Sequence, residues 1–331
     1  MSPYSLLAIL LSFFATLRIL PSWIFRAKKA DLIGSDVHKA DKRNIAELGG
    51  LPVICGFLSG VLVYIAFRVF VYQETSTVFA LFAIITSILI AAIIGLVDDI
   101  LGWKIGLRQI HKFLFTIAIS LPIIVINAGN SIMNIPFLGP VEFGRLYPFL
   151  IIPVAMIGAS NAFNMIAGFN GLEAGMGIII LTTLSFIAYK TGTYWLAVMG
   201  LCMVSALAAF MIYNFYPSKI FPGDILTYSV GAMIGIMAIM GNMEKFALIM
   251  FIPYFIEFFL KARGKMKKES FGKRLSDGSI TNRYKEWYGI EHIAISFLIK
   301  IKKKAYEWEV VLLILGIQSL LALATIGYYF I

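Results

Sequence analysis

Long apolar runs alternate with short polar connections along almost the whole chain. Each run holds roughly the 20 residues that a helix needs to cross a hydrocarbon layer of about 30 Å. Backbone groups inside a bilayer must be hydrogen-bonded within the protein, and these runs are too long for barrel strands, so helices are predicted. The ten predicted spans are residues 4–25, 49–72, 77–97, 112–128, 147–165, 173–189, 193–214, 225–241, 244–261 and 308–330. The expected fold is all-α and polytopic, with residues 1–331 forming a single integral membrane domain.

Basic residues concentrate in the connections on one predicted side of these helices. An extracytosolic N-terminus places five connections on a common side. They are residues 26–48, 98–112, 162–172, 215–224 and 261–307, and they hold 23 of the 28 Lys and Arg residues. Because positively charged connections tend to remain in the cytosol, this side is predicted to be cytosolic.

The longest connection on each predicted side carries a sequence pattern of its own. Glycines and prolines in residues 129–146, on the other side, are typical of a small hairpin or a capping loop. Segment 261–307 begins as a basic loop and later carries apolar residues at helical spacing beside lysines. This pattern predicts a basic amphipathic helix that lies on the membrane surface. Its apolar positions are Ile290, Ile293, Phe297 and Ile301.

Composition narrows the functional classes. The chain is 60% hydrophobic with a net charge of +10, and membrane topology explains that charge without nucleic-acid binding. Cys55 and Cys202 both fall in apolar spans, so neither a disulfide framework nor a CxxC metal site is expected. The first apolar run lacks the features of a cleaved signal peptide and is expected to be retained. No Walker A sequence is present, which argues against ATP-driven activity.

Three aspartates stand at the cytosolic ends of predicted spans. Asp98 and Asp99 close the third span, and Asp224 precedes the eighth within the sequence FPGD. Carboxylates are costly in a membrane, and an adjacent pair favours a nearby cation or a role as a base. Asp98 or Asp224 could instead cap a helix. Because all three aspartates lie on the same predicted side of the membrane, a divalent-ion site is favoured over separate helix caps.

A segment rich in asparagine and glycine also falls on the cytosolic side. Residues 161–175 read NAFNMIAGFNGLEAG and contain neither Lys nor Arg. Amide oxygens can ligate Mg²⁺, and glycines allow a ligand to approach the backbone, although small residues also serve helix packing. Lys112 and Arg108 follow the aspartate pair and supply the positive charge that a phosphate site requires.

Four sequence elements together resemble the polyprenyl-phosphate N-acetylhexosamine-1-phosphate transferases. These elements are GSDVHKADKRNIAELGG at 34–50, the Asp98–Asp99 pair, the segment 161–175 and FPGD at 221–224. Ala167 and Asn170 stand where bacterial members usually carry acids, so the chain is most similar to the archaeal and eukaryotic dolichyl-phosphate branch. The His-rich loop of the peptidoglycan branch is also missing, which favours UDP-GlcNAc as the donor.

The resemblance implies roles for individual residues. Asn164 and Asp224 would ligate Mg²⁺, for which Mn²⁺ could substitute, and Lys112 would bind donor phosphate. Asp98 and Asp99 would organise the acceptor phosphate and the surroundings of the metal. Residues implied to lie near the nucleotide sugar are Gly34, Ser35, Asp36, Glu47 and Asn170, the last of them beside the uracil.

Two departures from the family pattern affect this assignment. Ala46 replaces a proline that is usual in the family, and the Arg-His-Arg cluster of eukaryotic members has no secure counterpart. Lys273 and Arg274 are the nearest candidates for that cluster. His38 and His111 are expected to have surface or packing roles rather than to contact substrate.

The implied activity is transfer of GlcNAc-1-phosphate from UDP-GlcNAc to a dolichyl or polyprenyl phosphate, with release of UMP. This is the first step of lipid-linked glycan assembly in protein N-glycosylation, and its site would face the cytosol, at the plasma membrane if the cell is prokaryotic. Another UDP-N-acetylhexosamine donor remains an alternative, and a homodimer is compatible with the sequence.

Two other classes of function remain open. A cation-coupled transporter could use the three aspartates and Glu257 as an ion path, but it would be expected to carry acids near the midplane of several spans. Glu257 alone falls inside a predicted span, near its cytosolic end. A non-catalytic membrane scaffold would not explain why Asp and Asn residues share one side.

Overall fold

The chain is mostly helical in the computed structural model, which describes residues 2–39, 44–105, 109–135 and 139–330. Its helices are α1 (Pro3–Lys29), α2 (Gly50–Ala66), α3 (Val78–Ile105), α4 (Gln109–Val125), α5 (Ile152–Met165), α6 (Leu172–Lys190), α7 (Tyr194–Asn214), α8 (Gly223–Met240), α9 (Glu244–Met250), α10 (Ile252–Arg263), α11 (Ile290–Lys302) and α12 (Glu307–Tyr329). Short π-helical turns at Phe67–Val71 and Tyr147–Ile151 extend α2 and lead into α5. The expected all-α fold is confirmed.

Eight helical segments within the described residues are long and apolar enough to span a membrane. The two other predicted spans differ from expectation. The apolar part of α4 is only Leu114–Val125, and the span expected at 244–261 is divided between α9 and α10 at Phe251. Pro253 lacks the N–H that would continue the helical hydrogen bonds across this break. Gln318 Nε2, from α12, donates to the Met250 carbonyl oxygen there at 3.1 Å.

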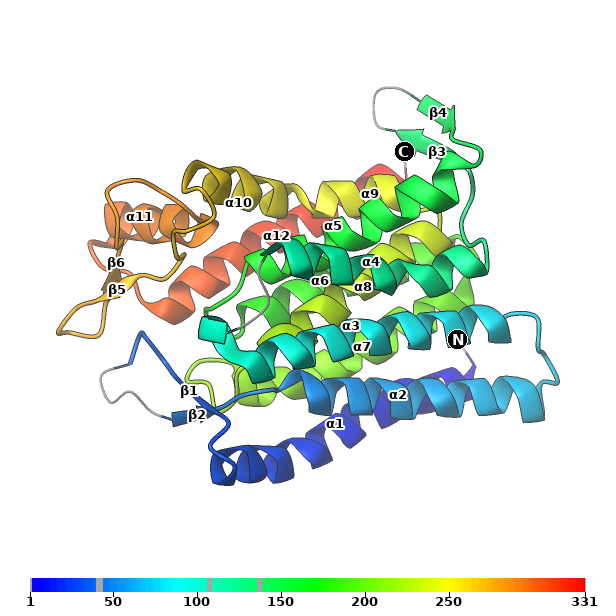
Figure 1. Cartoon of the computed structure of the whole chain (residues 1–331), viewed down its shortest axis with the longest axis horizontal. Coiled ribbons are helices and arrows are strands. Elements are labelled where there is room, and N and C mark those ends of the chain that lie inside the picture. Colours follow the sequence, from blue (N-terminus) through cyan, green and yellow to red (C-terminus); the bar gives the residue numbers. More distant parts are fainter. Residues whose placement is uncertain (1, 40–43, 106–108, 136–138, 331) are drawn as a thin grey trace.

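The helices lie side by side, and their connections gather at two opposite ends (Figure 1). One end carries the hairpin of β1 (Ile33–Ser35) and β2 (Asn44–Ala46), the short pair β5 (Lys273–Arg274) and β6 (Ile280–Thr281), and α11. This is the site end. The other end carries β3 (Ile132–Ile135) and β4 (Gly139–Glu142), an antiparallel pair that confirms the expected hairpin. The β1–β2 hairpin was not expected, because three-residue strands carry little periodic signal.

The helix expected late in segment 261–307 is present as α11, but the apolar face proposed for it is only partly correct. Ile290 is buried, whereas Phe297 and Ile301 are exposed. The buried side of α11 instead includes Ala294, Ile295 and Leu298. The helix therefore packs on the protein through one apolar side and leaves another uncovered. That second side is available for the predicted contact with the membrane surface.

Helix α8 is the most enclosed element of the fold. Every residue from 225 to 239 is buried, and the helix packs against α3 and α5. Gly95 of α3 permits a close approach, because a Cβ there would lie 2.5 Å from the carbonyl carbon of Asp224. The start of α8 is thus fixed directly against the end of α3.

Gly95→Ala is expected to lower the melting temperature of the purified protein. The added methyl group forces α3 and α8 apart, and overpacking of this kind costs about 1–3 kcal/mol. Gly316→Ala is the matched control, since a Cβ at this α12 position meets nothing within 4 Å. Alanine also has the better helix propensity, so the control should keep or raise the melting temperature. Equal melting temperatures for the two variants would contradict the close packing at Gly95.

Candidate active site

The end of α3 and the start of α8 are joined by Asp99. Its Oδ1 accepts the backbone N–H of Asp224 at 2.8 Å, and its Oδ2 accepts that of Ile225 at 3.2 Å. These amides belong to the first turn of α8, where backbone N–H groups have no acceptor within the helix. Gly223 makes room for the carboxylate, because it has φ +71° and a Cβ there would lie 2.5 Å from Asp99 Oδ2. Asp99, rather than Asp98 or Asp224, therefore caps the N-terminus of α8.

Lys112 connects the two other aspartates. Its Nζ forms an ion pair with Asp98 and lies 3.3 Å from Asp224 Oδ2. Asp98 is buried, and the lysine side chain itself is only 18% exposed, so this ammonium is a fixed charge rather than a mobile one. Two acids and one lysine from α3, α4 and α8 thus meet at a single point.

Asn164 joins this group from α5. Its Oδ1 accepts a hydrogen bond from Thr227 Oγ1 at 3.0 Å, and the same hydroxyl lies 3.3 Å from the Asp224 carbonyl oxygen. Asn164 is therefore tied to the first turns of α8, beside Asp224. The aspartates, the lysine and the asparagine singled out in the sequence come from four helices and lie at the site end.

The elements 34–50 and FPGD are hydrogen-bonded to each other. Phe221 N–H donates to the Ala46 carbonyl oxygen at 2.8 Å, and Gly49 N–H donates to the Phe221 carbonyl oxygen at 2.9 Å. A Cβ at Gly34 would lie 2.5 Å from Glu47 Oε1, so a larger residue there would displace the Glu47 side chain. Burial raises the pKa of the Glu47 carboxyl. The hairpin is thus fixed beside the start of α8.

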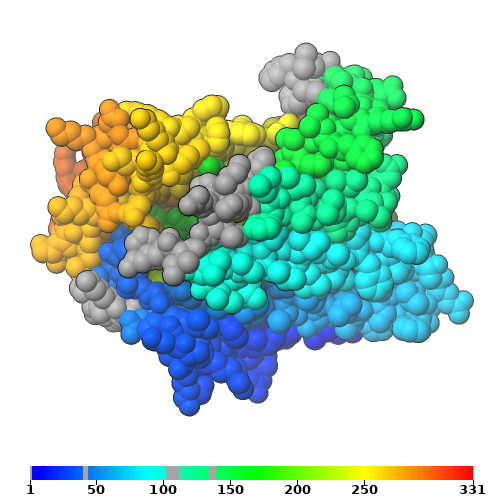
Figure 2. Space-filling view, viewed as in Figure 1, coloured from blue at the N-terminus to red at the C-terminus, as the bar shows by residue number. Residues whose placement is uncertain are grey.

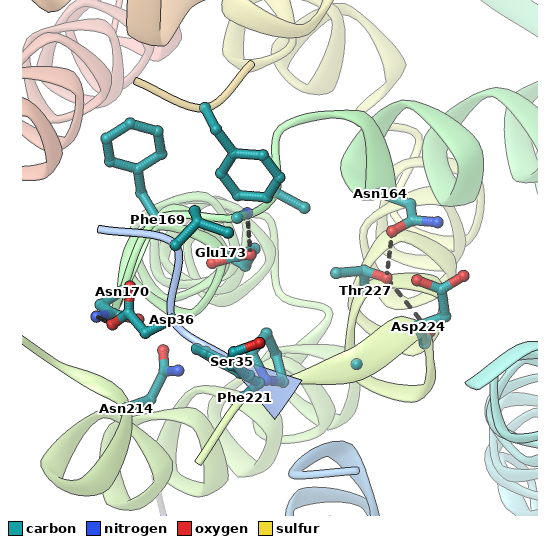
Figure 3. Close-up of a pocket in the computed structure, with 16 residues that line it drawn as sticks. Ser35, Asp36, Asn164, Phe169, Asn170, Glu173, Asn214, Phe221, Asp224 and Thr227 are labelled. Carbon is teal, nitrogen blue, oxygen red and sulfur yellow. Dashed lines mark hydrogen bonds between the residues drawn. The ribbon is translucent and has the colours of Figure 1, made fainter. Parts of the chain in front are cut away.

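A cavity of about 220 Å³ opens among these elements at the site end. Figure 2 shows a hollow there between the blue N-terminal and the yellow to orange C-terminal parts of the chain. The lining residues are Ser35, Asp36, Val37, Asn164, Ala167, Gly168, Phe169, Asn170, Glu173, Asn214, Phe221, Pro222, Gly223, Asp224, Thr227 and Phe271. In Figure 3, Asp36 and Asn170 lie on the opposite side of the cavity from Asn164, Thr227 and Asp224.

Other residues singled out in the sequence lie outside the cavity lining. Asp98, Asp99 and Lys112 lie behind Asp224, in contact with it or with its backbone. Gly34 and Glu47 belong to the adjoining hairpin. Lys273 and Arg274 form β5 and are not among the described lining residues, whereas the nearby Phe271 is. Arg108 and the side chain of His111 lie outside the described part of the chain.

Glu307 is a buried residue of the site end that none of the sequence motifs includes. Its Oε1 accepts the backbone N–H of Asn170 at 3.0 Å, and its Oε2 lies 3.5 Å from Lys39 Nζ. His38 lies 3.7 Å from the same carboxylate, with its ring packed against Phe169. Glu307 opens the last span, so the rule that drew attention to Asp98 and Asp224, an acid at a span end, could have found it.

The oxygens of Asp98, Asp224 and Asn164 suit a divalent cation such as Mg²⁺, because carboxylate and carboxamide oxygens are its preferred protein ligands. Asp36, His38 and Glu307 also place one ligand atom each within 4.8 Å of one another. Each cluster already contains a lysine, Lys112 in the first and Lys39 in the second. The second cluster includes the His38 imidazole, which suits transition metals, whereas the first offers oxygen donors alone. The first group therefore fits Mg²⁺ better.

Comparison with known proteins agrees with this arrangement. The model of glycosyl transferase family 4 matches residues 81–242. A protein of Saccharolobus solfataricus, provisionally named UDP-N-acetylglucosamine–dolichyl-phosphate N-acetylglucosaminephosphotransferase, is 40% identical over 97% of this chain and 95% of its own. A protein of Sulfolobus acidocaldarius with the same provisional name is 35% identical over 98% and 95%. The enzyme of that name from Dictyostelium discoideum is 26% identical over 73% and 68%. The resemblance seen in the motifs is confirmed, and the chain belongs to glycosyl transferase family 4.

Proposed function

We propose that this integral membrane protein transfers GlcNAc-1-phosphate from UDP-GlcNAc to a dolichyl or polyprenyl phosphate and releases UMP. One observation carries the proposal: Asp98, Asp224, Lys112 and Asn164 converge from four helices beside a cavity at the site end. The names of the relatives support the donor and the acceptor class. By the distribution of basic residues, the site end faces the cytosol.

The reaction needs positioning and charge neutralisation more than it needs a strong base. An oxygen of the lipid phosphate attacks the β-phosphorus of the donor, a new P–O–P linkage forms, and UMP leaves with the electrons of the broken bond. The attacking phosphate is already anionic at neutral pH, so Asp98 has only to orient it or remove a residual proton. Lys112, fixed beside Asp224, offers a positive charge to the donor phosphates.

Asn164 and Asp224 would hold a divalent ion, Mg²⁺ or Mn²⁺, with Asp98 beside them. Such an ion, when bound, would neutralise charge on the pyrophosphate. Thr227 fixes the Asn164 carboxamide with its Oδ1 as the hydrogen-bond acceptor, and Asp99 fixes the backbone that carries Asp224. The chain therefore holds both proposed ligands in place through contacts of its own.

A donor panel tests this function. Purified protein with polyprenyl phosphate and Mg²⁺ should release UMP from UDP-GlcNAc faster than from UDP-glucose or other UDP-hexosamines, and EDTA should stop the release. Omission of the lipid acceptor is the control, since hydrolysis alone would persist without it. Absence of UMP release with every UDP-sugar would reject the proposal. Cation flux into proteoliposomes without UMP release would favour the transporter alternative.

A further inference from the structure

A carboxylate fixes the orientation of a carboxamide at one side of the cavity. Asn170 Nδ2 donates to Asp36 Oδ2 at 2.9 Å. A carboxylate only accepts hydrogen bonds, so Asn170 must turn its NH₂ group toward Asp36 and its Oδ1 away. An asparagine amide can otherwise take either of two orientations of almost the same shape. Asp36 removes that choice.

Both partners are held by further hydrogen bonds. Asp36 Oδ1 accepts the backbone N–H of His38 at 2.9 Å, and the backbone N–H of Asn170 donates to Glu307 Oε1 at 3.0 Å. Each of the two residues is only 4% exposed. Neither can turn without breaking buried hydrogen bonds, so the orientation of the carboxamide is a fixed property of the cavity wall.

The remaining polar atom of this carboxamide is accessible from the cavity. Asn170 lines the cavity, and its Oδ1 has no hydrogen-bond partner among the described residues. Nor is Asn170 Oδ1 one of the described side-chain atoms that are fully buried without a hydrogen-bond partner. It is therefore an acceptor that a ligand in the cavity can reach.

The surroundings of this acceptor suit a flat aromatic ligand. Phe169, Phe221 and Phe271 line the cavity, and aromatic side chains can stack on nucleobases. Asn170 and Phe169 lie across the cavity from Asn164 and Asp224 (Figure 3). If the proposed function holds, the phosphates of the donor occupy the side of Asp224, and its base reaches the side of Asn170.

We infer that Asp36 is a positioning residue that makes the site select uracil over cytosine. In a uracil joined to ribose through N1, N3–H is the only N–H of the base, so Asn170 Oδ1 accepts from N3–H. Cytosine carries a lone pair at N3, so two acceptors would then face each other without a proton between them. Such a mismatch leaves a buried polar group unsatisfied. The inference rests on the proposed function, because it requires a uridine nucleotide as donor.

Binding of UMP and CMP to the full-length protein, measured by calorimetry, tests the inference. The unchanged protein should bind UMP about tenfold to hundredfold more tightly than CMP. Asp36→Asn supplies a donor as well as an acceptor, so Asn170 can turn, and the preference should fall to about threefold or less. Asp36→Glu keeps a group that only accepts and should keep the preference. A purely structural role predicts the reverse order, because asparagine matches the shape of aspartate and glutamate does not.

Two results would overturn the inference. One is an unchanged preference for UMP in Asp36→Asn, and the other is equally tight binding of UMP and N3-methyl-UMP to the unchanged protein. The proposed function fails separately, if no UDP-sugar supports UMP release while the preference for UMP follows Asp36 as described.

Discussion

Asp224→Ala is expected to reduce the rate of UMP release by roughly a thousandfold or more, since a single fixed group that stabilises transition-state charge is often worth about 10²–10³ and this one also holds the ion. The side chain contacts Lys112 and adjoins the Asn164–Thr227 pair. Its removal takes away one proposed metal ligand and leaves Lys112 paired with Asp98 alone. The loss should appear in kcat, because the missing charge acts on the reacting phosphates.

The protein should remain folded in this variant. Asp99 binds the backbone amides of residues 224 and 225, and alanine retains both amides. Asn164→Ala should show a comparable loss of activity. Glu142→Ala is the matched control, because this exposed carboxylate belongs to the hairpin at the other end of the molecule. Near-normal turnover in Asp224→Ala, with an unchanged melting temperature, would reject the metal assignment.

The general outline of this fold could be predicted because a bilayer restricts the chain so strongly. Apolar runs of span length identify helices, and basic residues identify the side on which their connections lie. The same reasoning fails where an element is short or irregular. The break between α9 and α10 depends on Pro253 and on Gln318 from another helix, and no local pattern reveals that second contact.

At the site, likewise, the sequence could indicate the residues but not the contacts that they make. The sequence indicated that Asp98, Asp99 and Asp224 serve one function, and the structure brings them together. It could not indicate that Asp99 caps α8 while Asp98 pairs with Lys112, because both arrangements depend on how α3, α4 and α8 pack. Lys273 and Arg274 are indicated only by their charge and their order along the chain, and in β5 they are not among the described residues that line the cavity.

Lys112→Met is expected to lower kcat/KM for UDP-GlcNAc by about a hundredfold to a thousandfold. Methionine keeps much of the length and apolar volume of the lysine stem, so the change mainly removes the ammonium group that lies between Asp98 and Asp224. The two carboxylates then face each other without that charge, which should strengthen their attraction for a divalent ion. The variant should therefore need less Mg²⁺ for half-maximal activity while it turns over more slowly.

The response to Mg²⁺ distinguishes binding of donor phosphate by Lys112 from mere neutralisation of the two aspartates. If Lys112 only neutralised the aspartates, added Mg²⁺ would replace its charge and restore the rate; if it binds donor phosphate, saturating Mg²⁺ leaves the loss in place. Lys190→Met is the matched control, because this exposed lysine closes α6 at the other end of the molecule. Full recovery of Lys112→Met at high Mg²⁺ would assign the lysine to charge balance, and the contact with the donor phosphates would then have to come from another cation at the site end.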